Sequence, residues 1–146
     1  MQSHACEACG TNYEKGTGRG YNNRVFCDPC LSTDEKWTLR NRNKFLKRNY
    51  SLTVFEYRNL FDAQGEVCKC CNTKLDISAV QTPRNGKRSG TEPVVDHCHT
   101  TGRVRGILCF SCNVALGHAK DDPEILKSMI EYLNNQETPS QKETQQ

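Results

Sequence analysis

The cysteines constrain this chain more than any other residue type. Eight of the ten fall into four Cys-x-x-Cys pairs, which are Cys6/Cys9, Cys27/Cys30, Cys68/Cys71 and Cys109/Cys112. Each pair can supply two thiolates to one ion, and two pairs complete the tetrahedral shell that zinc prefers. Seventeen residues separate the first two pairs and 37 separate the last two. We therefore predict two four-cysteine zinc sites, one from each half of the set.

Composition shows why metal ions are needed. The 146 residues are 35% hydrophobic, and the mean hydropathy is −0.78, so apolar burial alone is a weak source of stability. An even number of cysteines would also suit disulfides. The N-terminus, MQSHACEACG, lacks a secretory signal, and no apolar run approaches the roughly 18 residues of a membrane span. We therefore expect reduced thiols that bind zinc, no membrane contact, and a cytoplasmic location, in the host cytoplasm if the chain is phage-encoded.

Positive charge accompanies the cysteine motifs. The net charge is +3, but residues 1–113 carry 17 Lys and Arg against 11 Asp and Glu, whereas the remainder is acidic. This bias favours a polyanionic partner.

Residues 1–31 hold the first four cysteines and are predicted to form a zinc-ribbon-like module. Two roles remain open for it: a structural clip in place of a larger core, which we favour, and a direct contact with nucleic acid. A second polar and basic segment, Thr82–Glu92, could likewise touch nucleic acid or form a flexible surface tip.

A basic helix is predicted to follow this module and to connect it to the rest of the chain, within residues 32–50. Ser32 and Glu35 form a capping-box pattern, so the helix should begin near Thr33 and continue to about Asn49. It could be a solvated connector, but its cations favour contact with the DNA backbone. The candidate contacts are Arg40, Arg42, Lys44, Lys47 and Arg48.

Two further helices are predicted. Thr53 and Glu56 form a second capping box, which opens a core helix that ends at Gln64-Gly65. Near the C-terminus, an Asp N-cap before Pro123 opens a helix with an apolar face, which should dock on the core or on a partner chain. We assign no catalytic role to Asp121 or Asp122. Residues 135–146 are expected to form a disordered tail.

The stretch PVVDHCHTTGRVRGILCFSCN, residues 93–113, is predicted to form a hairpin that leads into a helix. Val94-Val95 reads as a short buried strand that delivers Asp96 and His97 at its end. Thr101-Gly102 can turn the chain into a return strand over 103–108. Cys109 and Cys112 would then bind zinc where the helix begins, with Asn113 in its first turn.

This stretch combines the residue types of a phosphodiesterase. Asp96 and Asn113 offer hard oxygen ligands that suit Mg²⁺, with Mn²⁺ as a substitute. An imidazole such as that of His97 can take a proton from an attacking water. Both side chains can face one phosphate only if the strand ends or bends between them.

Three other polar residues of the stretch, His99, Arg103 and Arg105, are candidates for contacts with phosphate. His99 could assist or be a surface residue, and Arg103 and Arg105 could hold flanking phosphates if both lie on the return strand. An alternative, that His97 or His99 binds zinc, is unnecessary because four cysteines already fill each site.

Three segments of the chain resemble a known protein family. DHCHTTGRVRGILCFSCNVALG, with LTVFEYRNLFDAQGEVCKCC before it and DDPEILKSMIEYL after it, resembles the recombination endonuclease VII family of phage nucleases, within the His-Me finger (HNH-like) superfamily. The resemblance implies a ββα-metal core stapled by zinc, Asp96 and Asn113 as Mg²⁺ ligands, His97 as general base and His99 in support. It also implies products with a 5′ phosphate and a 3′ hydroxyl. Leu116 departs from the family's namesake, which has a carboxylate there.

We therefore expect a small, zinc-stabilised α+β protein with a nuclease domain over residues 51–134. The expected activity is Mg²⁺-dependent endonucleolytic cleavage of duplex or branched DNA, by nicking or at branch points. The alternative is a non-catalytic zinc-finger DNA-binding protein on a nuclease scaffold. A homodimer is possible.

Overall fold

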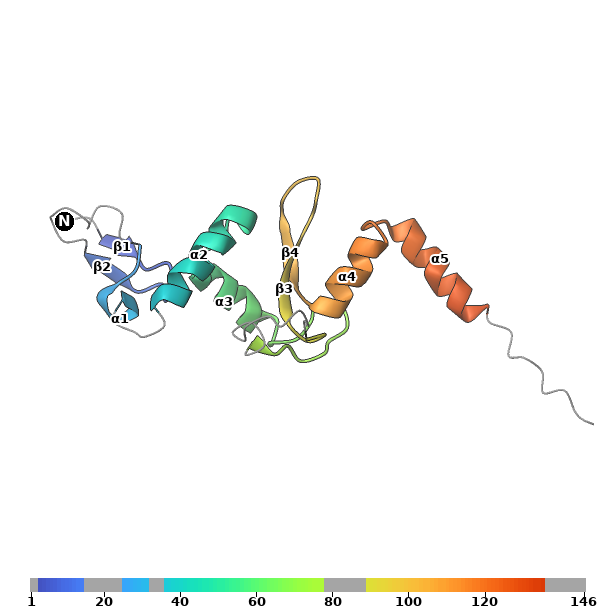
Figure 1. The fold of residues 1–146 in the computed structure, drawn as a ribbon, viewed down its shortest axis with the longest axis horizontal. Helices are drawn as coiled ribbons and strands as arrows, with labels where there is room; N and C mark the ends of the chain where they lie inside the picture. Colours follow the sequence, from blue (N-terminus) through green and yellow to red (C-terminus); the bar gives the residue numbers. More distant parts are fainter. Residues whose placement is uncertain (1–2, 15–24, 32–35, 78–88, 136–146) are drawn as a thin grey trace, which may run out of the picture.

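The structure, a computed structural model, describes residues 3–14, 25–31, 36–77 and 89–135. The elements follow one another along its long axis (Figure 1), in the order β1 (Ser3–Ala5), β2 (Asn12–Glu14), α1 (Asp28–Leu31), α2 (Lys36–Tyr50), α3 (Val54–Ala63), β3 (Pro93–His97), β4 (Val104–Cys109), α4 (Phe110–His118) and α5 (Pro123–Asn134). Strands β1 and β2 form one antiparallel pair, and β3 and β4 form another. This mixture of helices and small sheets confirms the expected α+β class. Within the described ranges, no helix is long and apolar enough to cross a membrane.

The described part of the N-terminal module has its own small core. Cys6, Ala8, Phe26 and Cys27 are buried together, and Leu39 of α2 packs against this cluster and against the larger one. Leu39 thereby joins the two cores. The segment between the cysteine pairs, residues 15–24, lies outside the described residues.

Polar contacts also fix the module to α2 and α3. Glu7 accepts hydrogen bonds from Asn43 Nδ2 at 2.6 Å and Lys47 Nζ at 2.7 Å, and its carbonyl accepts one from the Phe55 N–H at 2.9 Å. Gly10 has φ +75°, and a Cβ there would lie 2.5 Å from the Phe55 ring, so this turn requires glycine. The first cysteine pair is therefore braced against the start of α3.

Helix α2 differs slightly from its prediction. It ends at Tyr50 rather than at about Asn49, and the next residue, Ser51, takes φ +55° as the chain leaves the helix. Its expected capping box, Ser32–Glu35, lies outside the described residues, as does most of the basic segment Thr82–Glu92. The apolar anchor Leu46 is buried in the larger core, whereas Phe45 is exposed.

Helix α3 begins as predicted. Thr53 Oγ1 accepts a hydrogen bond from the Glu56 N–H at 3.1 Å, and the Glu56 carboxylate accepts one from the Thr53 N–H at 2.7 Å. These bonds lower the pKa of Glu56 because they stabilise the charged carboxylate. Val54, Tyr57 and Phe61 bury the inner face of the helix. The capping-box prediction is therefore confirmed.

The hairpin β3–β4 forms the centre of the larger core. Val95 pairs with Ile107 and Val94 with Leu108, and the buried residues among these pack against α3. The pairing slips by one residue between Asp96 and His97: Asp96 lies opposite Gly106, but His97 lies opposite Val104. Arg105 of β4 is consequently an extra residue, which makes this a β-bulge in the return strand.

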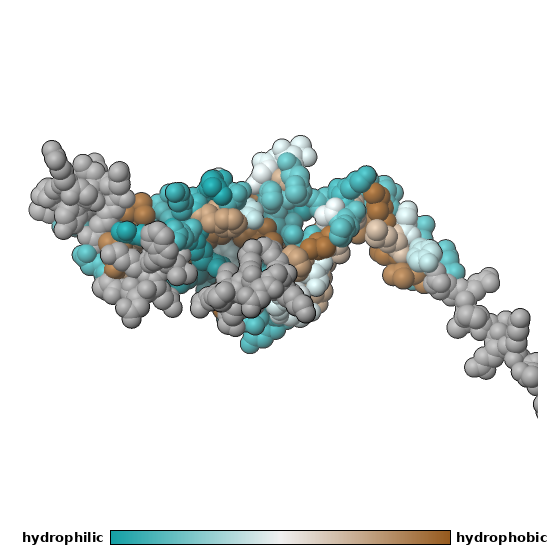
Figure 2. All heavy atoms as spheres, viewed as in Figure 1, coloured by the Kyte–Doolittle hydropathy of each residue, from teal (hydrophilic) through white to brown (hydrophobic). Residues whose placement is uncertain are grey.

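The C-terminal helices settle one of the two alternatives for the apolar face near the C-terminus. Helix α4 ends at His118, and α5 follows after a short turn. The apolar face of α5 does not dock on the core of this chain, since Met129, Ile130, Tyr132 and Leu133 are exposed. Figure 2 shows brown, hydrophobic atoms along this outlying helix. The N-cap of α5 is Asp122, as expected. The tail from residue 136 lies outside the described residues.

Candidate metal centres and active site

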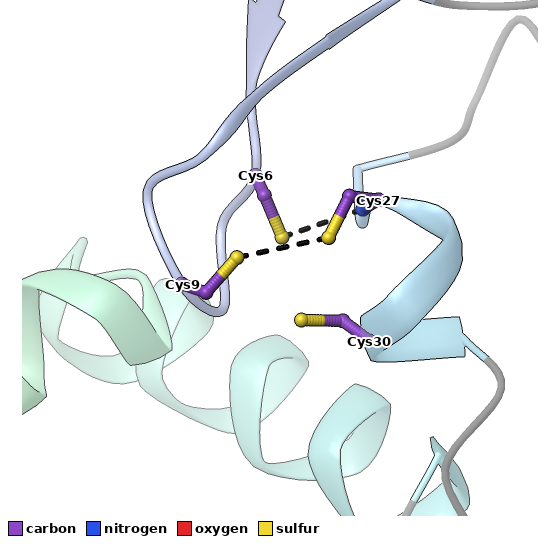
Figure 3. Close-up of side chains that lie close together, drawn as sticks. All are labelled: Cys6, Cys9, Cys27 and Cys30. Carbon is purple, nitrogen blue, oxygen red and sulfur yellow. Dashed lines mark hydrogen bonds between the residues drawn. The ribbon is translucent and has the colours of Figure 1, made fainter.

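The first four cysteines converge as predicted (Figure 3). The sulfur atoms of Cys6, Cys9, Cys27 and Cys30 all lie within 4.8 Å of one another. The Cys9 and Cys27 sulfurs are 3.6 Å apart, close to the edge of about 3.8 Å that a tetrahedron of Zn–S bonds near 2.3 Å would have. A disulfide would need about 2.05 Å, and all ten cysteines are free. The geometry therefore fits zinc and contradicts the disulfide alternative.

The second group has the same form. Cys68, Cys71, Cys109 and Cys112 place their sulfurs within 4.8 Å of one another, and the Cys71 and Cys109 sulfurs are 3.8 Å apart. Cys109 is also the N-cap of α4, where its sulfur accepts a hydrogen bond from the Cys112 N–H at 3.4 Å. Cys70 is exposed and lies outside the group. A metal here would tie the loop after α3 to the hairpin and to α4.

Threonine hydroxyls prepare one thiol in each group. Thr11, at 3.4 Å, lowers the pKa of Cys9 to about 6, and Thr73, at 3.2 Å, lowers the pKa of Cys71 to about 6. A thiolate rather than a thiol binds zinc, so these exposed cysteines are already suited to the metal. Burial instead raises the pKa of Cys109, so proton release there depends on metal binding.

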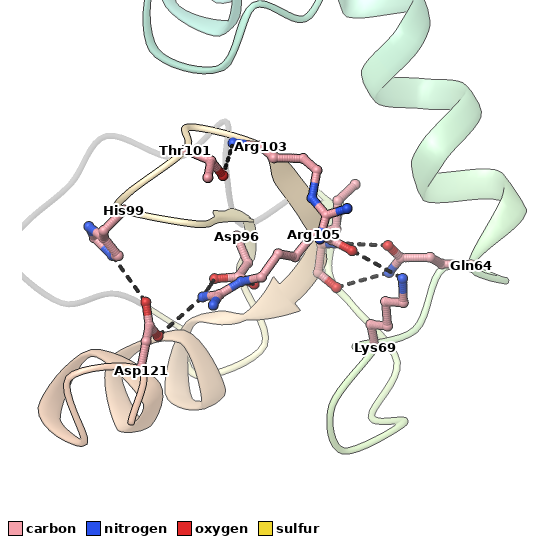
Figure 4. A network of polar contacts seen from close by, with 9 residues as sticks. Gln64, Lys69, Asp96, His99, Thr101, Arg103, Arg105 and Asp121 are labelled. Carbon is pink, nitrogen blue, oxygen red and sulfur yellow. Dashed lines mark hydrogen bonds and ion pairs between the residues drawn. The ribbon is translucent and has the colours of Figure 1, made fainter. Parts of the chain in front are cut away.

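A polar network lies at the end of the hairpin (Figure 4). Arg105, the extra residue of the bulge, turns its side chain onto Asp96: Nε donates to Oδ2 and Nη2 donates to Oδ1, both at 2.7 Å. This carboxylate is buried, with only 8% of the residue exposed. Hydrogen bonding to Asp96 raises the pKa of Arg105, which therefore stays charged. Arg105 was expected to hold phosphate, but here it neutralises the predicted magnesium ligand.

His97 lies among aromatic rings. Its centroid is 5.4 Å from that of Tyr50, with the rings close to edge-to-face, and 4.9 Å from that of His99. His97 is half-buried and His99 is exposed. Neither histidine belongs to the four-sulfur groups, which supports the view that they are not zinc ligands. Sequence reasoning missed Tyr50, the last residue of α2.

A second missed residue is Asp121. Its carboxylate lies 3.1 Å from Arg105 Nη2 and 3.6 Å from His99 Nε2, as Figure 4 shows. One signal could have pointed to it, because an N-cap needs a single aspartate and two stand before Pro123. Asp122 takes the cap, which leaves Asp121 available for the network.

The remaining candidates lie on other elements. Asn113 is half-buried in the first turn of α4, directly after Cys112 of the second four-sulfur group. Arg103 is exposed in the turn before β4, so the expectation that Arg103 and Arg105 share the return strand is wrong. The two arginines are therefore not paired on one face by strand geometry.

The side chains of Gln64 and Lys69 bind backbone groups of the bulged strand β4. Gln64 donates to the Ile107 carbonyl at 2.9 Å and accepts from the Ile107 N–H at 2.8 Å, as a neighbouring strand would. Lys69 Nζ donates to the Arg105 carbonyl at 3.0 Å. A Cβ on Gly106 would lie 2.7 Å from the Lys69 side chain, so glycine permits this approach. Strand β4 is thus held by its pairing with β3 and by the side chains of Gln64 and Lys69.

The basic residues of α2 fall into two groups. Arg40, Lys44 and Arg48 are exposed and spaced four residues apart, so they share one face of the helix. The other two have intramolecular contacts: Lys47 pairs with Glu7, and the guanidinium of Arg42 lies 4.7 Å from the ring centroid of Tyr57. We refer to Arg40, Lys44 and Arg48 as the basic face.

Comparisons with known proteins agree with the resemblance noted above. The model of the recombination endonuclease VII family matches residues 43–135. Gene 59 protein of Mycobacterium phage L5 is 40% identical over 87 residues, which are 59% of this chain and 46% of that protein. Its counterpart in Mycobacterium phage D29 is 40% identical over 85 residues, 58% of this chain and 44% of that protein. The chain thus matches less than half the length of these relatives.

Among solved structures, the crystal structure of the ββα-Me type II restriction endonuclease Hpy99I is similar with a TM-score of 0.36 and 24% sequence identity. The similarity covers 92% of this chain and 66% of that one.

Proposed function

Because the chain belongs to the recombination endonuclease VII family, we propose that it is a metal-dependent DNA endonuclease with a ββα-metal core. One observation carries the proposal. Asp96 and His97 stand at the end of β3, beside a register shift that makes Arg105 of β4 an extra residue, and α4, which follows β4 directly, holds Asn113 in its first turn. A carboxylate, an imidazole and an amide oxygen so arranged are the groups that metal-assisted phosphodiester hydrolysis uses.

In the proposed reaction, His97 takes a proton from a water molecule as the water oxygen bonds to phosphorus. The bond from phosphorus to the 3′ oxygen breaks, and the 3′ oxygen takes a proton from solvent, which leaves a 5′ phosphate and a 3′ hydroxyl. His97 is half-buried, and its contact with Tyr50 restricts the orientation of the imidazole. His99 is exposed on the same loop and could contact phosphate or assist proton transfer.

Asp96 and Asn113 are the residues that would hold the catalytic metal, Mg²⁺ or Mn²⁺. The donor set suits a hard cation, and Mg²⁺ usually takes one or two carboxylates and keeps several waters. Asp96 is buried and both of its oxygens accept hydrogen bonds from Arg105, so a divalent ion would bind only when Arg105 releases one of them. When bound, the metal would stabilise the negative charge on the phosphate and on the leaving oxygen.

DNA is the proposed substrate, and the basic face of α2 is the proposed contact with its backbone. Arg40, Lys44 and Arg48 are exposed and can neutralise phosphates. Lys47 and Arg42 are engaged within the chain, which makes them weaker candidates than the sequence suggested. Arg103, exposed at the tip of the hairpin, is a further candidate. Arg105 would reach phosphate only by leaving Asp96.

Zinc is proposed to stabilise both four-cysteine sites. The alternative function, a non-catalytic DNA-binding protein, needs zinc but does not need Asp96 and His97 together.

The exposed apolar face of α5 favours a homodimer that buries Met129, Ile130 and Leu133, and sedimentation of the purified protein would test this.

The activity can be tested on supercoiled plasmid, linear duplex and a four-way junction, each with Mg²⁺ or with EDTA. We expect Mg²⁺-dependent cleavage of at least one substrate. If the zinc-loaded protein binds these DNAs but cleaves none, the alternative function is correct.

A further inference from the structure

One carboxylate in the polar network has no part in the proposed reaction. Asp121 comes from the junction of α4 and α5, 16 residues along the chain from Arg105; it contacts Arg105 at 3.1 Å and lies 3.6 Å from His99. Its side chain is 19% exposed. We propose that Asp121 is a positioning residue: it gives Arg105 a second carboxylate partner, so that Asp96 can turn to a divalent cation. This inference rests on the proposed function.

The backbone holds Asp121 in place at a cost. Lys120 and Asp121 both have φ +55°, a left-handed conformation that L-residues adopt less readily than glycine. The Asp121 N–H donates to the Leu116 carbonyl at 2.9 Å, and the Asp122 N–H donates to the Ala119 carbonyl at 3.0 Å. Capping of α5 does not require Asp121, since Asp122 performs it. The strained turn therefore fixes the direction of Asp121 for another reason.

The geometry of Arg105 supplies that reason. Its Nη2 group is shared, with Asp96 Oδ1 at 2.7 Å and Asp121 Oδ1 at 3.1 Å. A guanidinium that holds both oxygens of Asp96 competes with any cation for the same carboxylate. With Asp121 beside it, Arg105 can release an Asp96 oxygen and keep a charged partner. Without Asp121, release would leave Arg105 with a weaker set of contacts.

The proposal predicts the metal affinity of specific variants. Mn²⁺ binding to zinc-saturated protein can be measured by electron paramagnetic resonance, without any cleavage. Asp121→Asn removes the charge with little change in shape and should weaken Mn²⁺ binding about tenfold, as is typical for partners of a metal ligand. Asp122→Asn removes the same charge one residue away and keeps an N-cap, so it should bind Mn²⁺ as the wild type does.

Arg105→Gln separates a specific effect from a general one. If Asp121 acts through Arg105, the variant Arg105→Gln should bind Mn²⁺ at least as tightly as the wild type, and adding Asp121→Asn to it should change nothing further. Equal losses in Asp121→Asn and Asp122→Asn would overturn the proposal. Weaker binding by Arg105→Gln would overturn it as well, even if Asp121→Asn failed to fold.

The proposed function fails in a different way. Its own control is Asp96→Asn, which should abolish Mn²⁺ binding. If the wild type bound no Mn²⁺, or if Asp96→Asn bound it equally well, the metal site itself would be wrong and this inference would fall with it. If Asp96→Asn lost binding while Asp121→Asn kept it, only the role of Asp121 would be wrong.

Discussion

Both carboxylate oxygens of Asp96 accept hydrogen bonds from the guanidinium of Arg105, each at 2.7 Å. The pair forms because the β-bulge makes Arg105 an extra residue and turns it toward the end of β3. A buried carboxylate that is predicted to bind a divalent cation is thus balanced by an internal cation. Either the Arg105 guanidinium or a bound divalent cation could therefore balance the negative charge of Asp96.

Arg105→Gln should destabilise the protein and make its stability depend on metal. The change leaves the buried Asp96 carboxylate without its partner, at a cost of about 1–2 kcal/mol, since Arg105 is itself about one-third exposed. A divalent cation can replace the lost charge. Mn²⁺ should therefore raise the melting temperature of Arg105→Gln more than that of the wild type in zinc-saturated samples. Equal shifts would contradict a metal site at Asp96.

The basic face of α2 should determine the salt dependence of DNA binding. Replacing Arg40, Lys44 and Arg48 together with glutamine should reduce the slope of log K against log salt by about 3, roughly one for each phosphate contact. Lys47→Gln is the matched control, because Lys47 pairs with Glu7, and its slope should stay that of the wild type. Fluorescence anisotropy over a salt series gives both values. A larger effect from Lys47→Gln would place the DNA on another face.

Substitutions at Cys112 and at its neighbour Asn113 should have different effects on folding and on zinc content. Cys112 belongs to the four-sulfur group, whereas Asn113 follows it in the first turn. Cys112→Ser should lose one zinc ion and unfold the hairpin–helix unit, and removal of zinc by a chelator should unfold the same unit in the wild type. Asn113→Ala should stay folded and cleave DNA more weakly. Circular dichroism and zinc analysis, with about two ions per wild-type chain expected from the two sites, distinguish them. Two equally folded variants would show that the zinc does not fix this helix.

The capping box of α3 should give a measurable pH dependence. Thr53→Ala should cost about 1 kcal/mol. The pKa of Glu56 is lowered in the folded protein by its bonds to Thr53, so its contribution is complete above the unfolded pKa of about 4.3 and is lost as pH falls through the folded pKa. The stability difference between wild type and Glu56→Gln should therefore shrink on acidification from pH 7. Denaturant unfolding at several pH values measures this difference, and a growing gap would reverse the sign.

Local spacing allowed much of the fold to be predicted. The cysteine pairs, the capping box at Thr53 and the turn before β4 depend on residues a few positions apart, whose chemistry is readable in order. The pairing of Arg105 with Asp96 was not predictable, since it follows from a one-residue slip in register that alternation cannot reveal. The same holds for Asp121, which is placed by two left-handed residues in a turn. The apolar face of α5 was identified, but periodicity does not say what covers it.

His97 is proposed to be the base of a metal-dependent nuclease. The direct test is cleavage of supercoiled plasmid with Mg²⁺ by the wild type, by His97→Ala and by His118→Ala, where His118 is an exposed histidine at the end of α4. All three proteins should show the same zinc content and the same circular dichroism. We predict that the wild type and His118→Ala cleave at similar rates and that His97→Ala loses at least about 100-fold. Undiminished cleavage by a folded His97→Ala would contradict the account.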